Sequence, residues 1–338
     1  MSELELMEQE LLKPSDALVA DMKALKGDII LLGVAGKMGP SMAKLARLAA
    51  DRAGVKKRII GVSRFSEPET QADLEANGIE TFAADLLNEA DLAALPDAPN
   101  VLYLAGTKFG TTGKEAFTWA MNAYLPGRVA ERYKNSRIVA FSTGNVYPFS
   151  PVTEGGVAED QPTGPVGEYG QSCLGRERVF QYFSSKYNIP TLIYRLNYAI
   201  DLRYGVLLEI ARSVAEQRPI DLTTGFVNVI WQGDANEIAI RALLHCEVPA
   251  KILNVTGPET VSVKWLAEQF GNILGKTPVF INQVQSTALL SNASLAHQLF
   301  GYPRVSLRQM IAMTGAWMQQ GGKTLNKPTH FQERNGKF

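Results

Sequence analysis

Short apolar runs alternate with amphipathic segments along the first two hundred residues of the chain. The runs are rich in branched residues, which is typical of buried parallel strands, and we expect such strands at residues 28–34, 57–63, 80–85, 100–106, 136–143 and 190–199. Between them, apolar residues recur at helical spacing, which predicts helices over 41–54, 68–77, 115–134 and 168–187. This alternation predicts an α/β fold with a doubly wound parallel sheet.

Beyond residue 200 the alternation loosens, which predicts a smaller mixed lobe. We expect helices over 204–217, 234–246, 262–274 and 306–319, and short strands at 227–231, 252–255 and 278–281. The chain then divides into an N-terminal extension with a short helix at 16–25 (1–27), a sheet domain (28–200), a lobe interleaved with the sheet (201–320) and a polar, loosely held tail (321–338).

Composition and charge exclude several classes of protein. The 34 basic and 34 acidic residues balance, so no overall positive field favours nucleic acid. No run reaches the ~18 apolar residues of a membrane span, and the acidic N-terminus is not a signal peptide. Two cysteines suggest a reducing compartment, and the three histidines have no ligand spacing, so we expect no metal. These features favour a cytoplasmic protein.

A glycine-rich turn, GVAGKMG, joins the first strand to the next helix. Gly33, Gly36 and Gly39 allow a tight turn in which backbone N–H groups and the helix N-terminus face a pyrophosphate. The spacing is G-x-x-G-x-x-G rather than G-x-G-x-x-G, and a glycine-rich connection without a ligand is the alternative. Because a strand precedes the turn and a helix follows it, we predict dinucleotide binding.

The end of the second strand predicts which dinucleotide binds. An acidic residue there would bind the ribose 2′-hydroxyl of NAD, but this chain has Ser63 and Arg64. A hydroxyl and a cation suit a 2′-phosphate, so NADP is favoured and NAD remains possible. An exposed arginine on a loop is the alternative interpretation.

Together with later segments, these motifs resemble the extended short-chain dehydrogenase/reductase family, the NAD(P)-dependent sugar epimerases and dehydratases. The resemblance covers about residues 28–320 and implies a Rossmann-like sheet that holds NAD(P). It implies cofactor contacts from the glycine turn with Lys37 and Met38, and from Asp85, Leu86, Ala105, Gly106, Lys108, Asn122, Ser142, Tyr169 and Asn197.

The same resemblance implies the catalytic groups. FSTGNVY (141–147) matches the family's serine/threonine strand end and places Thr143 at the catalytic hydroxyl position, and EYGQS (168–172) places Tyr169 at the catalytic tyrosine. A sugar-like substrate would contact Thr143 and further polar residues nearby, namely Asn145, Tyr198, Arg203 and Tyr204. For the residues after the sixth strand, packing within the core and lobe is the alternative.

The chain departs from the family four residues after Tyr169, where Cys173 replaces a lysine. In the family, that lysine lowers the pKa of the tyrosine and holds the nicotinamide ribose. Ionising a free tyrosine at pH 7 costs roughly 4 kcal/mol, so Tyr169 is a poor base, though still a proton donor or hydrogen-bond anchor, unless another cation takes the place of the lysine. We expect Lys108 to be a better candidate than Arg176, which could instead pair with a surface carboxylate; Cys173 itself suits a small buried residue.

The resemblance predicts an enzyme that transfers hydride between NAD(P) and a hydroxyl or keto carbon of a sugar-like, free or nucleotide-linked substrate. A cofactor-binding pseudoenzyme without turnover is the alternative, because the lysine is absent. In the domain plan, residues 28–200 would bind the dinucleotide and 201–320 the substrate. By analogy with relatives, the helices at 115–134 and 168–187 would form the interface of a homodimer.

Overall fold

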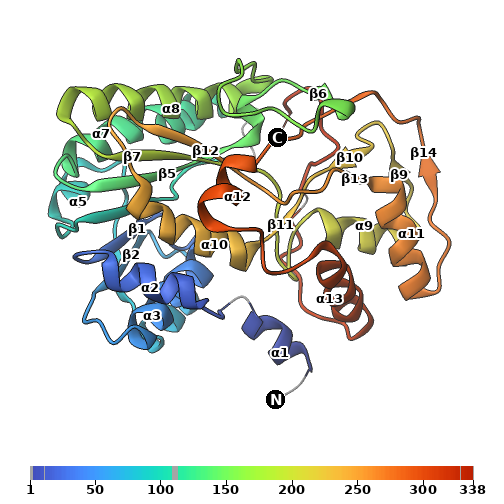
Figure 1. Ribbon diagram of the computed structural model, residues 1–338, viewed down its shortest axis with the longest axis horizontal. Helices are drawn as coiled ribbons and strands as arrows, with labels where there is room; N and C mark the ends of the chain where they lie inside the picture. The colour runs from blue at the N-terminus through green and yellow to red at the C-terminus, as the bar shows by residue number, and fades with distance from the viewer. Residues whose placement is uncertain (1–2, 11, 109–112, 328, 338) are drawn as a thin grey trace.

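Seven parallel strands form the central sheet of the protein (Figure 1). The structure is a computed structural model that describes residues 3–10, 12–108, 113–327 and 329–337. The strands lie in the order β12 (Lys251–Val255), β7 (Thr191–Leu196), β5 (Arg137–Thr143), β4 (Asn100–Tyr103), β1 (Ile29–Leu32), β2 (Ile59–Ser63) and β3 (Glu80–Ala83). The predicted Rossmann-like, doubly wound sheet is confirmed.

Helices cover both faces of this sheet. Alternate residues of the strands point to opposite faces, so Ile29 and Leu31 join one apolar core and Ile30 and Leu32 the other. The first face is covered by α2 (Asp16–Ala24), α3 (Gly39–Arg52), α10 (Gln232–Arg241) and α12 (Ser294–Phe300). The second is covered by α5 (Glu89–Ala94), α7 (Leu125–Arg132) and α8 (Gly167–Tyr187), while α4 (Pro68–Ala76) lies beside β3.

The helix expected over 115–134 is not continuous. It consists of α6 (Glu115–Trp119), a π-helical turn η1 (Ala120–Tyr124) and α7. Pro126 lacks an N–H, so the carbonyl of Asn122 has no α-helical donor four residues on. A π turn at this point accommodates the proline, and it leaves the Asn122 carbonyl for another partner.

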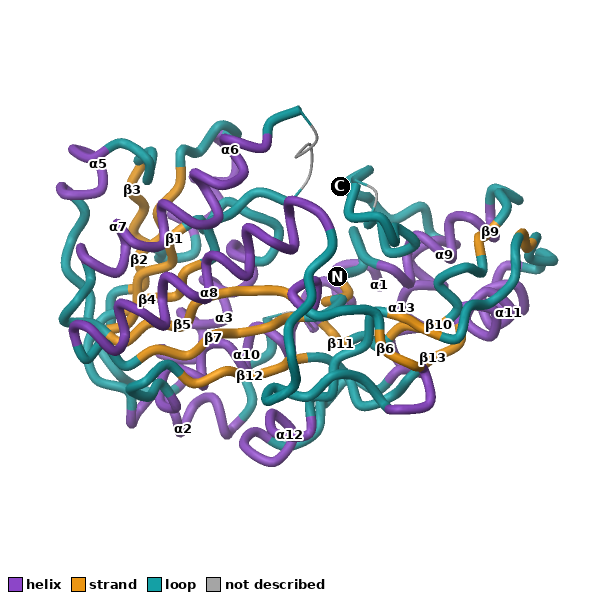
Figure 2. The backbone as a smooth tube through the Cα atoms, turned by 90° about the horizontal axis from the view of Figure 1, so that it is seen from above, coloured by secondary structure: helices purple, strands orange, loops and turns teal. Residues whose placement is uncertain are grey.

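The second lobe lies at one end of the sheet (Figure 2). Its core is formed by α9 (Val206–Ala215), α11 (Val263–Leu274) and α13 (Leu307–Gln319). Short two-stranded sheets accompany these helices, namely β8 (Ala199–Ile200) with β11 (Ile230–Trp231), β9 (Ile220–Asp221) with β14 (Phe280–Ile281), β10 (Phe226–Val227) with β13 (Val261–Ser262), and β6 (Ser150–Pro151) with β15 (Thr287–Ala288). Since β12 and α10 belong to the sheet domain, the chain returns to the sheet after residue 201.

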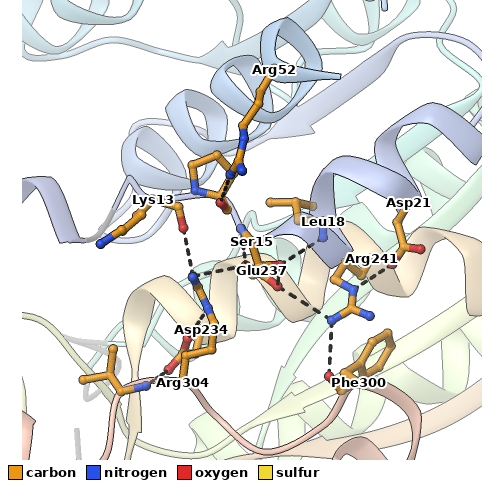
Figure 3. A network of polar contacts seen from close by, with 12 residues as sticks. Lys13, Ser15, Leu18, Asp21, Arg52, Asp234, Glu237, Arg241, Phe300 and Arg304 are labelled. Carbon is orange, nitrogen blue, oxygen red and sulfur yellow. Dashed lines mark hydrogen bonds and ion pairs between the residues drawn. The ribbon is translucent and has the colours of Figure 1, made fainter. Parts of the chain in front are cut away.

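The N-terminal extension packs on the sheet domain through an ionic network (Figure 3). The backbone N–H of Ser15 donates to Glu237 on α10 over 3.3 Å, and the Ser15 hydroxyl donates to the same carboxylate. Arg241 contacts Asp21 over 2.7 Å, and Arg304 donates to the carbonyl of Lys13. The helix α1 (Glu3–Glu10) precedes this network. None of the helices in the described part of the chain is both long and apolar enough to cross a membrane.

The C-terminal tail is not loosely held where the structure describes it. Phe331 is 3% exposed and lies in the core of the second lobe. Thr329 donates its N–H and hydroxyl to Glu209 of α9, and Arg334 donates to Thr287. The polar composition of residues 321–338 concealed these contacts, because each partner lies far away in the sequence.

We predict that Phe331→Ala lowers the free energy of unfolding by about 3 kcal/mol, because it removes a buried aromatic ring and leaves a cavity. Urea denaturation monitored by circular dichroism measures this change. Leu325→Ala is the matched control in the same tail, since Leu325 is 37% exposed, and should cost about 0.5 kcal/mol or less. Equal, small effects of both substitutions would contradict the packed tail.

Candidate active site

The glycine turn lies at the carboxyl end of β1 and is as tight as the sequence predicts. Gly33 has a φ of 93°, and a Cβ there would lie 2.8 Å from the backbone nitrogen of Ala105. A Cβ on Gly39, the first residue of α3, would lie 2.1 Å from the carbonyl oxygen of Val34. Only glycine fits at these positions, so the N-terminus of α3 stays close to the sheet edge. This cradle suits a dinucleotide pyrophosphate.

The other predicted cofactor residues follow neighbouring strands at the same edge. Ser63 ends β2, and Arg64 after it is exposed and makes no ion pair with the described residues. Asp85 follows β3 and accepts the N–H of Leu87, with Leu86 buried beside it. Gly106 follows β4 together with Ala105 and is exposed. The edge therefore carries small or polar groups on either side of the glycine turn.

A cavity of about 170 Å³ opens between this edge and the second lobe. Its lining includes most of the residues predicted for catalysis and substrate, namely Lys37, Met38, Lys108, Ser142, Thr143, Asn145, Tyr169, Asn197, Tyr198 and Tyr204. Arg203 does not line it; its guanidinium pairs with Asp201 over 3.2 Å. Tyr198 has a φ of 43°, a strained value for a tyrosine that turns the chain sharply at the cavity wall.

Thr143 and Tyr169 meet in this cavity from different elements. Thr143 is the last residue of β5, and Tyr169 lies in the first turn of α8. Their side chains are hydrogen-bonded, which lowers the pKa of Tyr169. Burial nevertheless raises that pKa well above the ordinary value, and the nearby Cys173 raises it further. At neutral pH the tyrosine therefore carries its proton and can donate it.

Cys173 is a buried, neutral residue. It is fully enclosed, packs with Val146, Tyr147 and Val157, and contacts Tyr169. Burial raises the pKa of its thiol. The interpretation of Cys173 as a small packing residue therefore agrees with its surroundings.

Arg176 does not pair with a surface carboxylate, and that alternative is wrong. The side chain is 6% exposed and points under the active site. Its Nη1 donates to the carbonyl of Phe141 over 2.7 Å, its Nη2 to Oδ1 of Asn122 over 2.7 Å, and its Nε to the carbonyl of Asn122 over 3.3 Å. This last acceptor is the carbonyl that Pro126 leaves without a helical donor. The charge of Arg176 lowers the pKa of Tyr169.

Asn122 supports the site from beneath. Its side chain is fully buried, accepts the N–H of Thr107, and donates to the carbonyl of Thr107 and the hydroxyl of Ser172. The predicted cofactor contact is therefore corrected, because this side chain has no surface left for a ligand. Gly106 lies against the side chains of Asn122 and Arg176, and a Cβ there would be 2.3 Å from Nη2 of Arg176.

A buried ion pair fixes α8 against the sheet. Arg195 of β7 and Glu177 of α8 are 1% and 0% exposed, with 2.6 Å between Nη2 and Oε2. Ser142 donates its hydroxyl to the same carboxylate over 2.5 Å, so its polar atom is directed inward although the residue lines the cavity. Asn197 likewise donates its amide to Asn228 over 2.8 Å. No sequence pattern revealed the pairing of Glu177 with Arg195.

Two lysines enter the cavity from the cofactor side. Nζ of Lys37 lies 3.4 Å from the centroid of the Tyr204 ring, and Nζ of Lys108 lies 5.8 Å from the centroid of the Tyr169 ring. Lys37 is exposed to the cavity but closely surrounded by protein atoms; this desolvation, and then the charge of Lys108, lowers its pKa to about 7. Burial lowers the pKa of Lys108 to about 8.

Sequence reasoning missed Thr329, which lines the cavity from the C-terminal tail. Nothing in the polar segment around it signals a role in the site. The expectation that Lys108 is better placed than Arg176 also changes, since the charge that lowers the pKa of Tyr169 comes from Arg176.

Three solved structures with the same fold are named as enzymes of nucleotide sugars. UDP-glucuronic acid 4-epimerase from Bacillus cereus, solved with UDP-glucuronic acid and NAD, is 21% identical, with a TM-score of 0.71 over 87% of this chain and 99% of that chain. UDP-glucose 4-epimerase from Thermus thermophilus, solved with NAD, is 17% identical, with a TM-score of 0.69 over 86% and 99%. The dTDP-glucose 4,6-dehydratase DesIV from Streptomyces venezuelae is 16% identical, with a TM-score of 0.72 over 87% and 97%.

No curated protein matches the sequence. A family model does match: residues 29–219, more than half of the chain, match the model of the NAD dependent epimerase/dehydratase family. This segment includes the glycine turn, Thr143 and Tyr169. The chain therefore belongs to the NAD-dependent epimerase/dehydratase family of enzymes.

Proposed function

We propose that the protein oxidises, reduces, epimerises or dehydrates a sugar-like substrate, free or nucleotide-linked, at a hydroxyl or keto carbon. The observation that carries this proposal is the hydrogen-bonded pair of Thr143 and Tyr169 in a cavity beside the glycine turn. When bound, NAD(P) supplies or accepts the hydride. The two residues hold the substrate oxygen and exchange its proton.

The position of Thr143 suits it to orient the substrate oxygen. Its backbone is fixed by pairing of β5 with β7, and its Oγ1 accepts the N–H of Asn145 over 3.2 Å. A hydroxyl held in this way does not need to reorganise when a substrate binds. Tyr169, hydrogen-bonded to it, is then directed to the same oxygen.

Tyr169 acts as the proton donor in reduction and as the acceptor in oxidation. Its raised pKa suits donation, whereas acceptance requires ionisation that a nearby positive charge favours. Arg176 supplies this charge in our proposal, because its guanidinium is held rigidly by Asn122 and Phe141 beneath the tyrosine. The residue thereby takes over one of the two tasks of the absent lysine.

We propose NADP as the preferred cofactor, with Arg64 and Ser63 at the 2′-phosphate. The exposed guanidinium of Arg64 after β2 supports this assignment, since it has no carboxylate partner among the described residues. A charge-assisted hydrogen bond to phosphate would be stronger than one to a hydroxyl.

A cytoplasmic homodimer also remains our proposal. Aromatic side chains on α6, η1 and α8 are exposed rather than packed, with Tyr124 57% and Tyr182 59% exposed. Trp119 on α6 is likewise 39% exposed. A second copy that covers these rings would bury them from water.

We expect Tyr169→Phe to reduce hydride transfer about a hundredfold or more, because it removes the proton that the reaction exchanges. Cofactor absorbance at 340 nm, followed across a panel of sugars and polyols, measures turnover, and fluorescence titration checks that the variant still binds NADP. Turnover that survives in Tyr169→Phe would contradict the assigned role. Tight NADP binding without turnover of any compound by the unaltered protein would favour the pseudoenzyme.

For Arg176→Met, we expect the pH profile of oxidation to move to higher pH by about one unit or more. Oxidation needs ionised Tyr169, and loss of the guanidinium charge raises the pKa of this tyrosine. Arg176→Lys is the matched control, since it keeps the charge and should move the profile less. Thermal unfolding checks that both variants fold. A folded Arg176→Met variant with an unmoved profile would exclude Arg176 as the source of the charge.

Replacing Arg64 should distinguish the two cofactors. We expect Arg64→Ala to weaken NADP binding about tenfold or more through loss of a charge-assisted hydrogen bond, while NAD binding changes little. Arg308→Ala, at an exposed arginine of α13, is the control. Isothermal titration measures all four affinities. Equal effects on NADP and NAD would refute the assignment of Arg64 to the 2′-phosphate.

A further inference from the structure

The last described residues, 329–337, join the second lobe to the start of α8, and we call them the terminal segment. Thr329 lines the cavity and is bonded to Glu209 of α9, while Phe331 lies in the core of the lobe. Gly336 packs on Gly167, the first residue of α8. The chain thus ends between the sheet domain and the second lobe (Figure 1). The terminal segment connects the cavity wall to the helix that carries the catalytic tyrosine.

The terminal segment is held along its length by contacts with both sides. Nε2 of Gln332 donates to the carbonyl of Asp221 over 2.9 Å. The guanidinium of Arg334 donates to the carbonyl of Thr287 over 2.9 Å and to its hydroxyl over 2.6 Å. The same guanidinium lies 4.1 Å from the ring centroid of Phe149, which follows β5. These contacts direct the end of the chain toward the start of α8.

The contact between Gly336 and Gly167 brings two backbones together. A Cβ on Gly167 would lie 2.3 Å from the carbonyl oxygen of Gly336, and a Cβ on Gly336 would lie 2.5 Å from Cα of Gly167. The φ angles, 73° and 75°, also favour glycine at both positions. The three atoms nearest to a Cβ on Gly167 all belong to Gly336. A side chain at either position would therefore push the terminal segment and α8 apart.

The first turn of α8 needs such a contact, because its own sequence is weak for a helix. Gly167 and Gly170 both lie in this turn, and glycine loses more conformational freedom than other residues when a helix forms. The N-cap residue is Val166, whose side chain cannot accept a hydrogen bond from the first N–H groups. Tyr169 therefore lies in a turn that depends on its neighbours.

The other contacts of α8 do not replace the terminal segment. Glu177, which forms the buried ion pair, lies eight residues after Tyr169, so it fixes the body of the helix. The indole N–H of Trp119 donates to Glu168 over 2.5 Å, but this bond is exposed to water. On a third side, Gly170 lies against the carbonyl of Asn145. The side of the turn formed by Gly167 is left to Gly336.

We propose that Gly336 is a positioning residue of the active site. By packing on Gly167 it holds the first turn of α8, and with it Tyr169, beside Thr143. Gly336 acts through the tyrosine and is not itself a catalytic residue. This inference rests on the proposed function, since it concerns the residue that exchanges the proton. The polar end of the chain is then a part of the site.

The first experiment measures the order of this turn and needs no substrate. In the full chain, we expect Gly336→Ala to speed amide hydrogen exchange in residues 167–172 about tenfold, because the turn opens more often without the contact. Mass spectrometry of the peptides measures the exchange, and thermal unfolding checks that the variant folds. Gly321→Ala is the matched control. Its φ is 69°, and a Cβ there would have no atom of the described residues within 4 Å, so exchange in this turn should not change.

A second variant weakens the terminal segment without altering either glycine. Arg334→Met removes the hydrogen bonds to Thr287, and we expect a smaller acceleration of exchange in the same turn. Arg308→Met, at an exposed position of α13, is the control and should have no effect there. Unchanged exchange in a folded Gly336→Ala variant, or equal changes in Gly336→Ala and Gly321→Ala, would overturn the proposal.

The second experiment asks whether the ordered turn matters for turnover. We expect Gly336→Ala to lower kcat about tenfold or more, since a displaced proton donor is costly, and to change KM less than about threefold, because the cavity wall is retained. Gly321→Ala should change neither. Faster exchange with an unchanged kcat would refute the link between Gly336 and Tyr169, while the enzyme itself would remain.

A third measurement separates this inference from the proposed function. If the unaltered protein turns over no compound, the proposed function fails on this panel, and NMR of ¹³C-labelled tyrosine decides the inference. The signal of Tyr169, assigned by its loss in Tyr169→Phe, should shift in Gly336→Ala and not in Gly321→Ala. A Tyr169 signal that stays in place in Gly336→Ala would exclude the positioning role.

Discussion

The geometry of the active site depends on the buried ion pair between Glu177 and Arg195. Two charges at this depth are tolerated only when their hydrogen bonds are complete. Here Ser142 donates to the carboxylate, and Nη1 of Arg195 donates to the hydroxyl of Tyr147, which donates to Asn254 of β12. The pair therefore joins α8 to β5, β7 and β12. If α8 moved along the sheet, a charge would be left buried and unpaired, at a cost of about 3–5 kcal/mol. Tyr169 is thus held beside Thr143.

The buried side chains of α8 that face the sheet determine the charge beneath Tyr169. Cys173 lies one turn after the tyrosine and contributes a neutral thiol, whereas Arg176 lies two turns after it and contributes a permanent charge. The guanidinium needs acceptors, and Pro126 provides one indirectly, because it frees the carbonyl of Asn122 within the π turn. Where the family has a lysine this chain has Cys173, and Arg176, Asn122 and Pro126 are arranged so that a guanidinium lies beneath Tyr169 instead. These matched contacts indicate a site whose wiring is changed but whose order is kept.

The sequence predicts the fold better than it predicts the site. Buried strands such as Ile29–Leu32 have a strong apolar pattern, and parallel pairing follows from the helices between them. The positions of Thr143 and Tyr169 follow from motifs with fixed places in that fold. By contrast, the contacts of Arg176 depend on a π turn that helical periodicity does not reveal, and Pro126 was the available signal. The place of Phe331 in the core depends on distant residues, so the polar composition of the tail did not predict it.

The cations beneath Tyr169 and in the cavity differ in how firmly their charge is fixed. Arg176 donates three hydrogen bonds beneath the tyrosine and stays charged whether or not the cavity is filled. Lys108 and Lys37 have pKa values lowered to about 8 and about 7, so near neutral pH a fraction of each is uncharged. The permanent charge beneath Tyr169 therefore comes from Arg176, whereas the charge of the two lysines varies with pH.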